Sequence, residues 1–223
     1  MPAFLFDMDG TMVDSMPWHA RSWVAFAREV GVPPPDAGFF RRTTGLTGVE
    51  VMREFFGERP VAELRACVER KEAIYREMFG PAFREVPGFG AFADAARGAG
   101  VKVACATAGD ADNIAFVLDH LGRHGFFDAV VGAHDVERGK PHPDLFLLAA
   151  QRMGVDPADC LVFEDAPHGI EAARRAGMRA VAIATTLPPD ELGAPGHVIA
   201  RATDFAGLDI ASLLSSLADA RQP

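Results

Sequence analysis

Cysteine, positive charge and long apolar runs are all scarce in this sequence of 223 residues. Its three cysteines, Cys67, Cys105 and Cys160, lack metal-ligand spacing, so we expect reduced structural thiols rather than a disulfide framework. Lysine and arginine total 22 against 31 acidic residues, and the net charge of −9 argues against nucleic acid as a partner. No apolar run approaches the ~20 residues that span a bilayer, and charged residues begin at Asp7, too early for a signal peptide. We therefore expect a cytoplasmic protein that binds no membrane, and nothing in the sequence implies a protein partner.

What the sequence does have is the composition of an ordinary folded protein, with 49% apolar residues and enough length for one sizeable core. Short apolar runs that suit buried strands of a parallel sheet recur at residues 3–6, 101–106, 128–132, 160–163 and 179–183. Helical stretches precede the later runs, and strands alternating with helices of about 10 to 15 residues indicate βαβ units. We therefore predict an α/β fold with a Rossmann-like open parallel sheet and helices on both of its faces.

The segment between the first two runs breaks this alternation. It has three stretches of amphipathic helical pattern separated by turn signals, at residues 18–30, 49–56 and 62–79. No strand pattern occurs there, and the pair Pro87-Gly88 suits a hinge that leads back to the core. We predict an inserted α-helical cap domain over residues 15–85, and a core formed by residues 1–14 and 86–223.

The last part of the sequence shows weaker patterns of secondary structure. After residue 183 we expect a loop from Leu187 to His197, then an edge strand, and a final helix from about Leu208. No residue in this part suggests a chemical role.

Polar side chains stand where the strand-like runs end. They are Asp7 and Asp9 after the first run, Thr107 after the second, Lys140 in the loop after the third, and Glu164 and Asp165 after the fourth. Alone, an Asp-x-Asp pair is common in turns and a threonine is a common helix cap, so it is the combination of these groups that indicates a functional site. Because open parallel sheets bind ligands at the carboxyl ends of their strands, we expect these groups to form one site.

These groups suit the transfer of a phosphoryl group. Asp7 and Asp165 offer the hard oxygen ligands that Mg²⁺ prefers, and the ion would neutralise the repulsion between a phosphate and an attacking carboxylate. Asp7 can then act as the nucleophile, and Asp9 as the general acid and base. The predicted phosphate-binding groups are Thr107, the backbone N–H of Ala108 near a helix N-terminus, and Lys140.

The sequence resembles the haloacid dehalogenase-like hydrolases in four motifs: Phe6-Asp7-Met8-Asp9-Gly10-Thr11, Thr107, Gly139-Lys140-Pro141 and Phe163-Glu164-Asp165. The similarity extends to about Ile183, and it is greatest to the branch of β-phosphoglucomutases and sugar phosphatases that carry a helical cap. It implies that Asp7 is the nucleophile, and that Asp9 is the acid and base and also a metal ligand through its backbone carbonyl. It further implies a metal ligand at Asp165, with Glu164 supporting either the metal or Lys140.

We expect His19, Gly45 and Thr47 of the cap to contact the substrate. His19 matches a hinge histidine of the mutase-like members, although its position also suits an ordinary residue in the first turn of a helix. Trp18 is as consistent with the interior of the cap as with the site. The second motif, which continues as Ala108-Gly109, departs from the commoner form in this branch.

A second departure separates two functions. β-Phosphoglucomutase carries a cap arginine that grips a bisphosphate intermediate, and this sequence has Gly48 at the corresponding position. We expect the nearby Arg41, Arg42 and Lys71 to be solvated charges that do not take over the role of that arginine. We therefore predict a Mg²⁺-dependent phosphatase of small phosphorylated metabolites, sugar phosphates among them, with a β-phosphoglucomutase-type isomerase as the alternative. A phospho-accepting signalling domain is a remote third, because such domains carry the phosphorylated aspartate on a middle strand and lack a cap.

Overall fold

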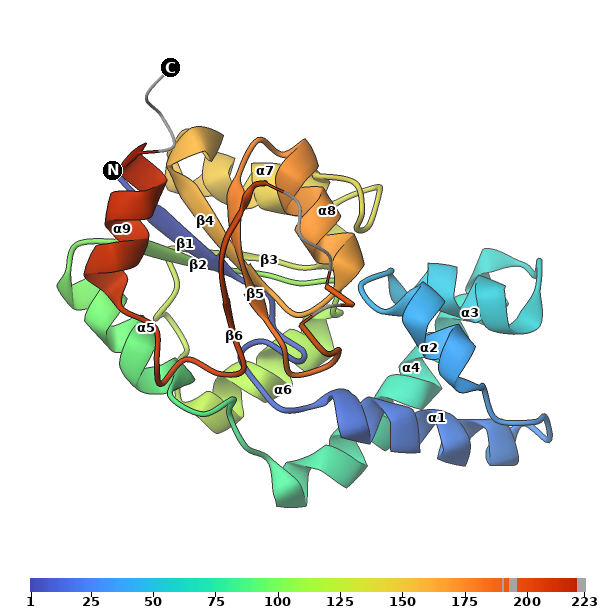
Figure 1. Cartoon of the computed structure of the whole chain (residues 1–223). Helices are drawn as coiled ribbons and strands as arrows, with labels where there is room; N and C mark the ends of the chain where they lie inside the picture. Colours follow the sequence, from blue (N-terminus) through green and yellow to red (C-terminus); the bar gives the residue numbers. More distant parts are fainter. Residues whose placement is uncertain (190, 193–195, 220–223) are drawn as a thin grey trace.

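Parallel strands form one open sheet at the centre of the core (Figure 1). The computed structural model describes residues 1–189, 191–192 and 196–219. Within them the sheet has the strand order β3-β2-β1-β4-β5-β6. The bounds are β1 (Ala3–Phe6), β2 (Lys102–Ala106), β3 (Ala129–Val131), β4 (Cys160–Glu164), β5 (Arg179–Ile183) and β6 (Val198–Ala202). The five predicted strands are confirmed, and β6 is the expected edge strand.

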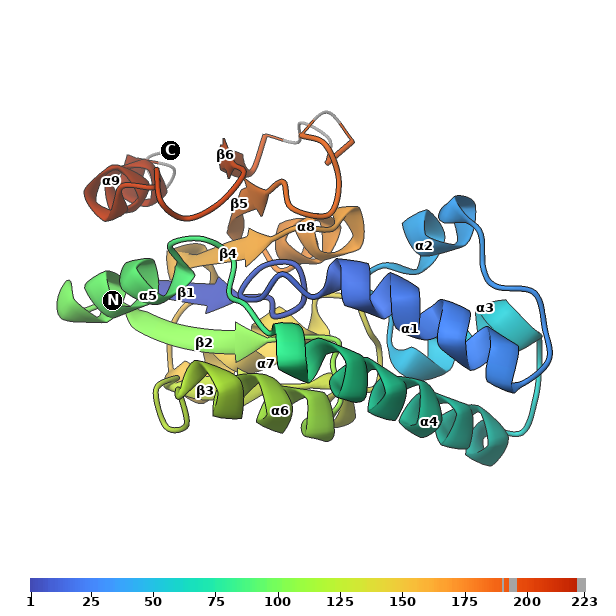
Figure 2. The same cartoon turned by 90° about the horizontal axis from the view of Figure 1, so that it is seen from below.

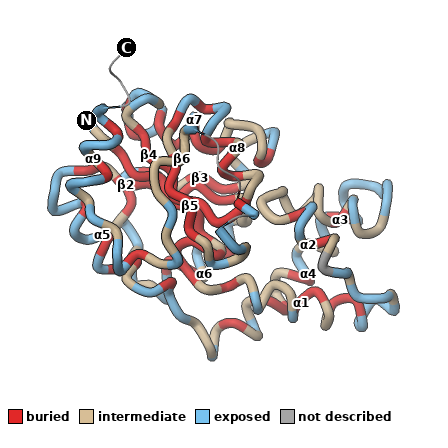
Figure 3. Tube along the Cα trace, viewed as in Figure 1, coloured by how far each residue is buried: buried red, intermediate tan, exposed pale blue. Residues whose placement is uncertain are grey.

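Helices cover both faces of the sheet, as predicted (Figure 2). One face carries α5 (Phe89–Gly98), α6 (Ala111–Leu121) and α9 (Ile210–Asp219), and the other carries α7 (Asp144–Met153) and α8 (Pro167–Arg175). Side chains alternate along β1, so that Phe4 and Phe6 face the first set of helices while Ala3 and Leu5 face the second. Because both faces are covered, every residue of β1 is buried (Figure 3), which explains its continuous apolar run.

Four further helices lie beside the carboxyl ends of the strands and form the cap (Figure 1). They are α1 (Met16–Glu29), α2 (Ala37–Thr43), α3 (Gly48–Phe56) and α4 (Val61–Phe79). Their interior is aromatic, with the ring of Trp23 packed edge-on against Phe39 and Phe55. Helix α2 was not predicted from the sequence. Its first turn is capped by Asp36, whose side chain accepts a hydrogen bond of 2.7 Å from the N–H of Phe39. Short 3-10 helices complete the connections at Gly80–Ala82, Ala133–Asp135 and Pro157–Asp159.

The two chain segments that join cap and core run side by side. Val13 and Glu85 form an antiparallel bridge, and the N–H of Val86 donates to the carbonyl of Met12 at 3.0 Å. Two paired segments of this kind can act together as a hinge. The domain boundaries themselves, with the cap at residues 15–85, stay a prediction. No helix in the described part of the chain is long and apolar enough to cross a membrane.

The aromatic layer on one face of the sheet gives a test of the core. The ring of Phe163 on β4 is fully buried, 4.8 Å from that of Phe6 and 5.3 Å from that of Phe92 between ring centroids. Phe163→Ala should lower the free energy of unfolding, measured with urea, by about 3–5 kcal/mol, because it leaves a cavity. The control Leu147→Ala removes a side chain on α7 that is 38% exposed, and it should change this energy by less than about 1 kcal/mol. Equal losses in the two variants would contradict this packing.

Candidate active site

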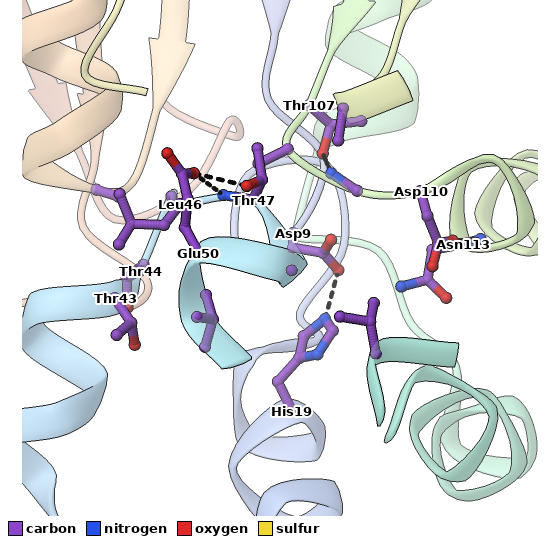
Figure 4. A pocket seen from close by; sticks show the side chains of 18 of the residues that line it. Asp9, His19, Thr43, Thr44, Leu46, Thr47, Glu50, Thr107, Asp110 and Asn113 are labelled. Atoms are coloured by element: carbon purple, nitrogen blue, oxygen red, sulfur yellow. Dashed lines mark hydrogen bonds and ion pairs between the residues drawn. The ribbon is translucent and has the colours of Figure 1, made fainter. Parts of the chain in front are cut away.

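All of the predicted site residues except Lys140 line one pocket between core and cap, with a volume of about 1100 Å³. The core members stand at the ends of three neighbouring strands: Asp7 and Asp9 after β1, Thr107 after β2, and Glu164 and Asp165 at the end of β4. β1 pairs in parallel with both β2 and β4, so their carboxyl ends lie side by side. Figure 4 shows the pocket from close by, with side chains of the cap and of the core reaching into it.

Lys140 lies beneath the pocket and joins two carboxylates. Its Nζ donates to Oδ1 of Asp7 at 2.5 Å and to Oε1 of Glu164 at 2.6 Å, and the ammonium-bearing side chain is only 1% exposed. Burial alone would lower the pKa of Lys140, but the two adjacent carboxylates overcome this effect and hold that pKa above its ordinary value. Lys140 is therefore charged at neutral pH. Gly169 in the first turn of α8 makes room for Glu164, because a Cβ there would overlap the carboxylate.

Three buried carboxylates, those of Asp7, Glu164 and Asp165, lie within 4.8 Å of one another. Burial, together with Glu164 and Asp9, raises the pKa of Asp7 to about 7 against the lowering effect of Lys140. Burial and the neighbouring carboxylates also raise the pKa of Asp165 well above its usual range. One ammonium group does not balance three carboxylates, and oxygen donors with excess negative charge fit a hard divalent cation.

The carboxylate of Asp9 is held by residues of the hinge and the cap (Figure 4). Its Oδ1 accepts hydrogen bonds from Ser15 Oγ at 2.7 Å and from the hydroxyl of Tyr75 at 3.2 Å, and it lies 3.1 Å from Nε2 of His19. Burial alone would raise the pKa of Asp9, but His19 and Ser15 hold it below its ordinary value. The Asp9 carboxylate is thus oriented by α1 and α4, whereas Asp7 is oriented by the core.

Lys71 contradicts the prediction that it is solvated, because its side chain is 3% exposed. Its Nζ lies 2.7 Å from Nδ1 of His19 and 2.9 Å from Glu72 Oε1, and the ring of Trp23 lies above it. An ammonium group can only donate, so Nδ1 of His19 accepts and its proton sits on Nε2, facing Asp9. Glu72 in turn accepts from Nδ2 of Asn113 at 2.8 Å, which ties this cap cluster to α6 of the core.

The other two residues expected to be solvated, Arg41 and Arg42, are exposed as predicted. The side chains of Arg41 and Arg42 are 65% and 60% exposed, and they pair with Glu191 and Glu54 respectively. Trp18 packs against Phe79 and the core cluster, with ring centroids 6.2 Å apart, and is not among the residues that line the pocket.

The loop after β2 carries Thr107 and Ala108 into the pocket. Thr107 is 2% exposed, and its Oγ1 accepts a 2.9 Å hydrogen bond from the N–H of Gly109. Helix α6 follows at once, with Asp110 as its N-cap accepting from Asn113 N at 2.7 Å. The helix N-terminus expected beside this loop is therefore present, although Asp110 occupies one of its N–H groups.

Gly45 and Thr47 lie where the cap meets the core loops. Gly45 has φ +91°, a value that favours glycine, and a Cβ there would lie 3.3 Å from Cβ of His168. The carbonyl of the preceding Thr44 lies 2.9 Å from Nδ1 of His168. Thr47 donates its hydroxyl to Glu50 at 2.6 Å at the start of α3. Both residues line the pocket, and their contact with substrate stays a prediction.

Sequence reasoning missed two residues after β5 and assigned no role to that part of the chain. Thr185 and Thr186 line the pocket, and Thr186 Oγ1 donates to Oδ2 of Asp165. No local pattern marks them, because their place in the site follows from the sheet order that sets β5 beside β4.

An open parallel sheet beneath a helical cap, with two aspartates just after β1 and a buried lysine between acidic side chains, is the arrangement of a capped α/β enzyme. A family model described as haloacid dehalogenase-like hydrolase matches residues 1–177. The chain belongs to this family and is an enzyme, as the four motifs predicted.

Several relatives extend this finding. The chain is 37% identical to the fructose-1-phosphate phosphatase YqaB of Escherichia coli, over 79% of this chain and 93% of that protein. It is 31% identical to the β-phosphoglucomutase of Bacillus subtilis, over 84% of this chain and 85% of that protein. A chloroplastic 5-amino-6-(5-phospho-D-ribitylamino)uracil phosphatase of Arabidopsis thaliana is 29% identical over 94% of this chain, which spans only 57% of that protein. The solved structure of a HAD hydrolase, family IA, variant 3, from Entamoeba histolytica matches with a TM-score of 0.88 at 25% identity, covering 98% of this chain and 100% of that one.

The raised pKa of Asp7 predicts a pH dependence of stability in the metal-free protein. The unfolded chain loses this proton near the ordinary value of 3.8, whereas the folded protein keeps it up to about pH 7. Folded Asp7 binds more protons inside that window, so its contribution to the free energy of unfolding falls as the pH rises from about 4 to about 7. Urea unfolding of wild type and Asp7→Asn in a chelator gives this contribution as the difference between the two. A difference that stays constant across the window would contradict the raised pKa.

Proposed function

We propose that this protein is a Mg²⁺-dependent phosphatase of small phosphorylated metabolites, sugar phosphates among them, and that its reaction passes through a phosphoryl ester on Asp7. The contact of 2.5 Å between Lys140 and Asp7, beside the buried carboxylates of Glu164 and Asp165, carries the proposal. A nucleophilic carboxylate must be ionised, and an adjacent ammonium group favours that state. Relatives named as phosphatases support the same reaction class.

The metal would be held by Asp7 and Asp165, with Glu164 close by and Asp9 through its backbone carbonyl. Bound there, Mg²⁺ would neutralise charge on the phosphate and the attacking carboxylate. The fit rests on the three clustered carboxylates, and on the raised pKa of Asp7, which a nearby cation would lower.

The protein's own groups carry out two steps. In the first, an oxygen of Asp7 bonds to phosphorus, the bond to the leaving oxygen breaks, and Asp9 gives that oxygen a proton. In the second, water attacks phosphorus, Asp9 takes its proton, and the bond from phosphorus to Asp7 breaks to release phosphate. Lys140 and the hydroxyl of Thr107 stabilise the charge on the phosphoryl group in both steps.

The surroundings of Asp9 suit this role. Three donors gather at its Oδ1, which leaves Oδ2 free to exchange a proton, and the lowered pKa of Asp9 favours the carboxylate that takes a proton from water in the second step. These donors come from the hinge and from helices α1 and α4 of the cap, so the position of the cap sets the orientation of the acid. The cap would also exclude bulk water from the phosphoryl ester while the leaving group is in place.

The packing at Gly48 favours a phosphatase over a mutase. A Cβ at Gly48 would lie 2.7 Å from Cγ1 of Val68, so α3 and α4 leave little space for a long side chain there. Arg42 is paired at the surface and Lys71 inside the cap, whereas Arg41, Arg53 and Arg65 line the pocket. The preference for transfer to water over return to a sugar therefore rests on Gly48, which stands where the mutase has its arginine.

Hydrolysis of p-nitrophenyl phosphate tests the proposal. Wild type should release p-nitrophenol with Mg²⁺ and stop in a chelator, and Asp7→Asn should lower kcat on the order of 1000-fold or more, because the nucleophile is lost. The control Asp94→Asn makes the same chemical change on α5, where the side chain is 62% exposed, and it should retain activity. Substantial activity in Asp7→Asn would refute the proposed nucleophile.

A second experiment separates phosphatase from isomerase. Incubated with glucose 1-phosphate, and with a trace of glucose bisphosphate as primer, wild type should release inorganic phosphate steadily without forming glucose 6-phosphate, because Gly48 replaces the arginine that grips the bisphosphate in the mutase. Coupled assays for the two products measure the ratio. Interconversion of the hexose phosphates with little net phosphate release would establish the isomerase instead.

A further inference from the structure

Two consecutive threonines after β5, Thr185 and Thr186, connect the loop that follows this strand to the end of β1. In the sheet, β5 lies beside β4, which lies beside β1, so the carboxyl ends of these strands are adjacent (Figure 1). Thr186 Oγ1 donates to Oδ2 of Asp165, and Thr185 Oγ1 donates to the carbonyl oxygen of Gly10. The two hydroxyls thus take different partners, one a carboxylate and the other the backbone.

Gly10 makes the contact with the carboxylate possible. Its φ of +81° suits glycine, and a Cβ at this position would overlap the carboxylate of Asp165 and lie 2.7 Å from Oγ1 of Thr186. The missing side chain therefore leaves the space in which Asp165 and Thr186 meet. Because Thr185 is bonded to Gly10 itself, the loop is held at a fixed distance from that space.

Asp165 depends on hydroxyl groups for its orientation. It is 2% exposed, and the ammonium group of Lys140 contacts the other two carboxylates of the site. In the described part of the chain, the hydrogen-bond donors to its carboxylate are Thr11 Oγ1, at 3.3 Å from Oδ1, and Thr186 Oγ1. Hydroxyl donors fix the plane of a carboxylate without cancelling its charge, which stays available to a cation.

We propose that Thr186 is a positioning residue of the metal site, whose hydroxyl holds Asp165 in the orientation that binds the divalent cation. This inference rests on the proposed function, because the cation site is part of it. The competing explanation is structural: the threonine fastens the loop between β5 and β6 to the core and has no effect on the cation. Residues that hydrogen-bond to metal ligands typically change metal affinity by about 10- to 100-fold when removed, and a fastening role predicts no such change.

Thr186→Val tests the proposal, since it removes the hydroxyl and keeps the shape of the side chain. The Mg²⁺ concentration that gives half of the full rise in Tm should increase about 10- to 100-fold, and so should the concentration that half-saturates p-nitrophenyl phosphate hydrolysis. Thr186→Ser should restore both values. The matched control Thr203→Val makes the same change at an exposed threonine after β6 that does not line the pocket, and it should leave both Mg²⁺ concentrations as in wild type.

The outcomes distinguish the role of Thr186 from the proposed function. A wild type that is neither stabilised by Mg²⁺ nor active with it would remove the proposed function. A Mg²⁺-dependent wild type whose Thr186→Val variant binds Mg²⁺ equally well would overturn the positioning role alone, and so would an equal loss in Thr203→Val. Should Thr186→Val not fold, Thr186→Ala gives the same readings, and unchanged Mg²⁺ binding in that variant would also overturn the role.

Discussion

Three buried carboxylates lie close to one buried ammonium group at the ends of β1 and β4, and the balance of this charge governs the site. Burying a charge is costly unless it is paired and hydrogen-bonded. Lys140 pairs with Asp7 and Glu164, whereas Asp165 is met by hydroxyl groups. The remaining repulsion appears as raised pKa values for Asp7 and Asp165. The same repulsion that makes the cluster unfavourable by itself would favour the binding of the proposed divalent cation.

The cap is connected to this charge cluster through Asp9. A chain of contacts runs from Asn113 on α6 to Glu72, then to Lys71, His19 and Asp9. Each member is partly or fully buried, and the lysine forces the proton of His19 toward Asp9. The orientation of Asp9, the proposed general acid, is therefore set by groups from both cap and core, and a shift of α4 against α6 would change that orientation.

Much of the fold could be predicted from the sequence because its signals are local. A continuous apolar run such as residues 3–6 indicates a strand buried on both faces, and acidic residues at its end indicate a ligand site. Helix α2 was not predicted because its seven residues are too few to show a helical period of hydrophobicity. The burial of Lys71 depends on Trp23 and His19, which only the packing of α1 against α4 brings near. Thr186 was missed because a single sequence does not reveal that β5 lies beside β4.

The paired segments at the hinge bear on how such a protein can diversify. Both ends of the cap leave the core from neighbouring positions, because Val13 bridges Glu85 and Met12 accepts from Val86. Bridged backbones lie about 5 Å apart, so any insert whose two ends lie that close could be accommodated without disturbing the sheet. Exchange of the insert would change the cap side of the pocket, including the residues that orient Asp9, while Asp7 and Lys140 stay in place. The junction thus lets the cap vary without moving the buried charge cluster of the core.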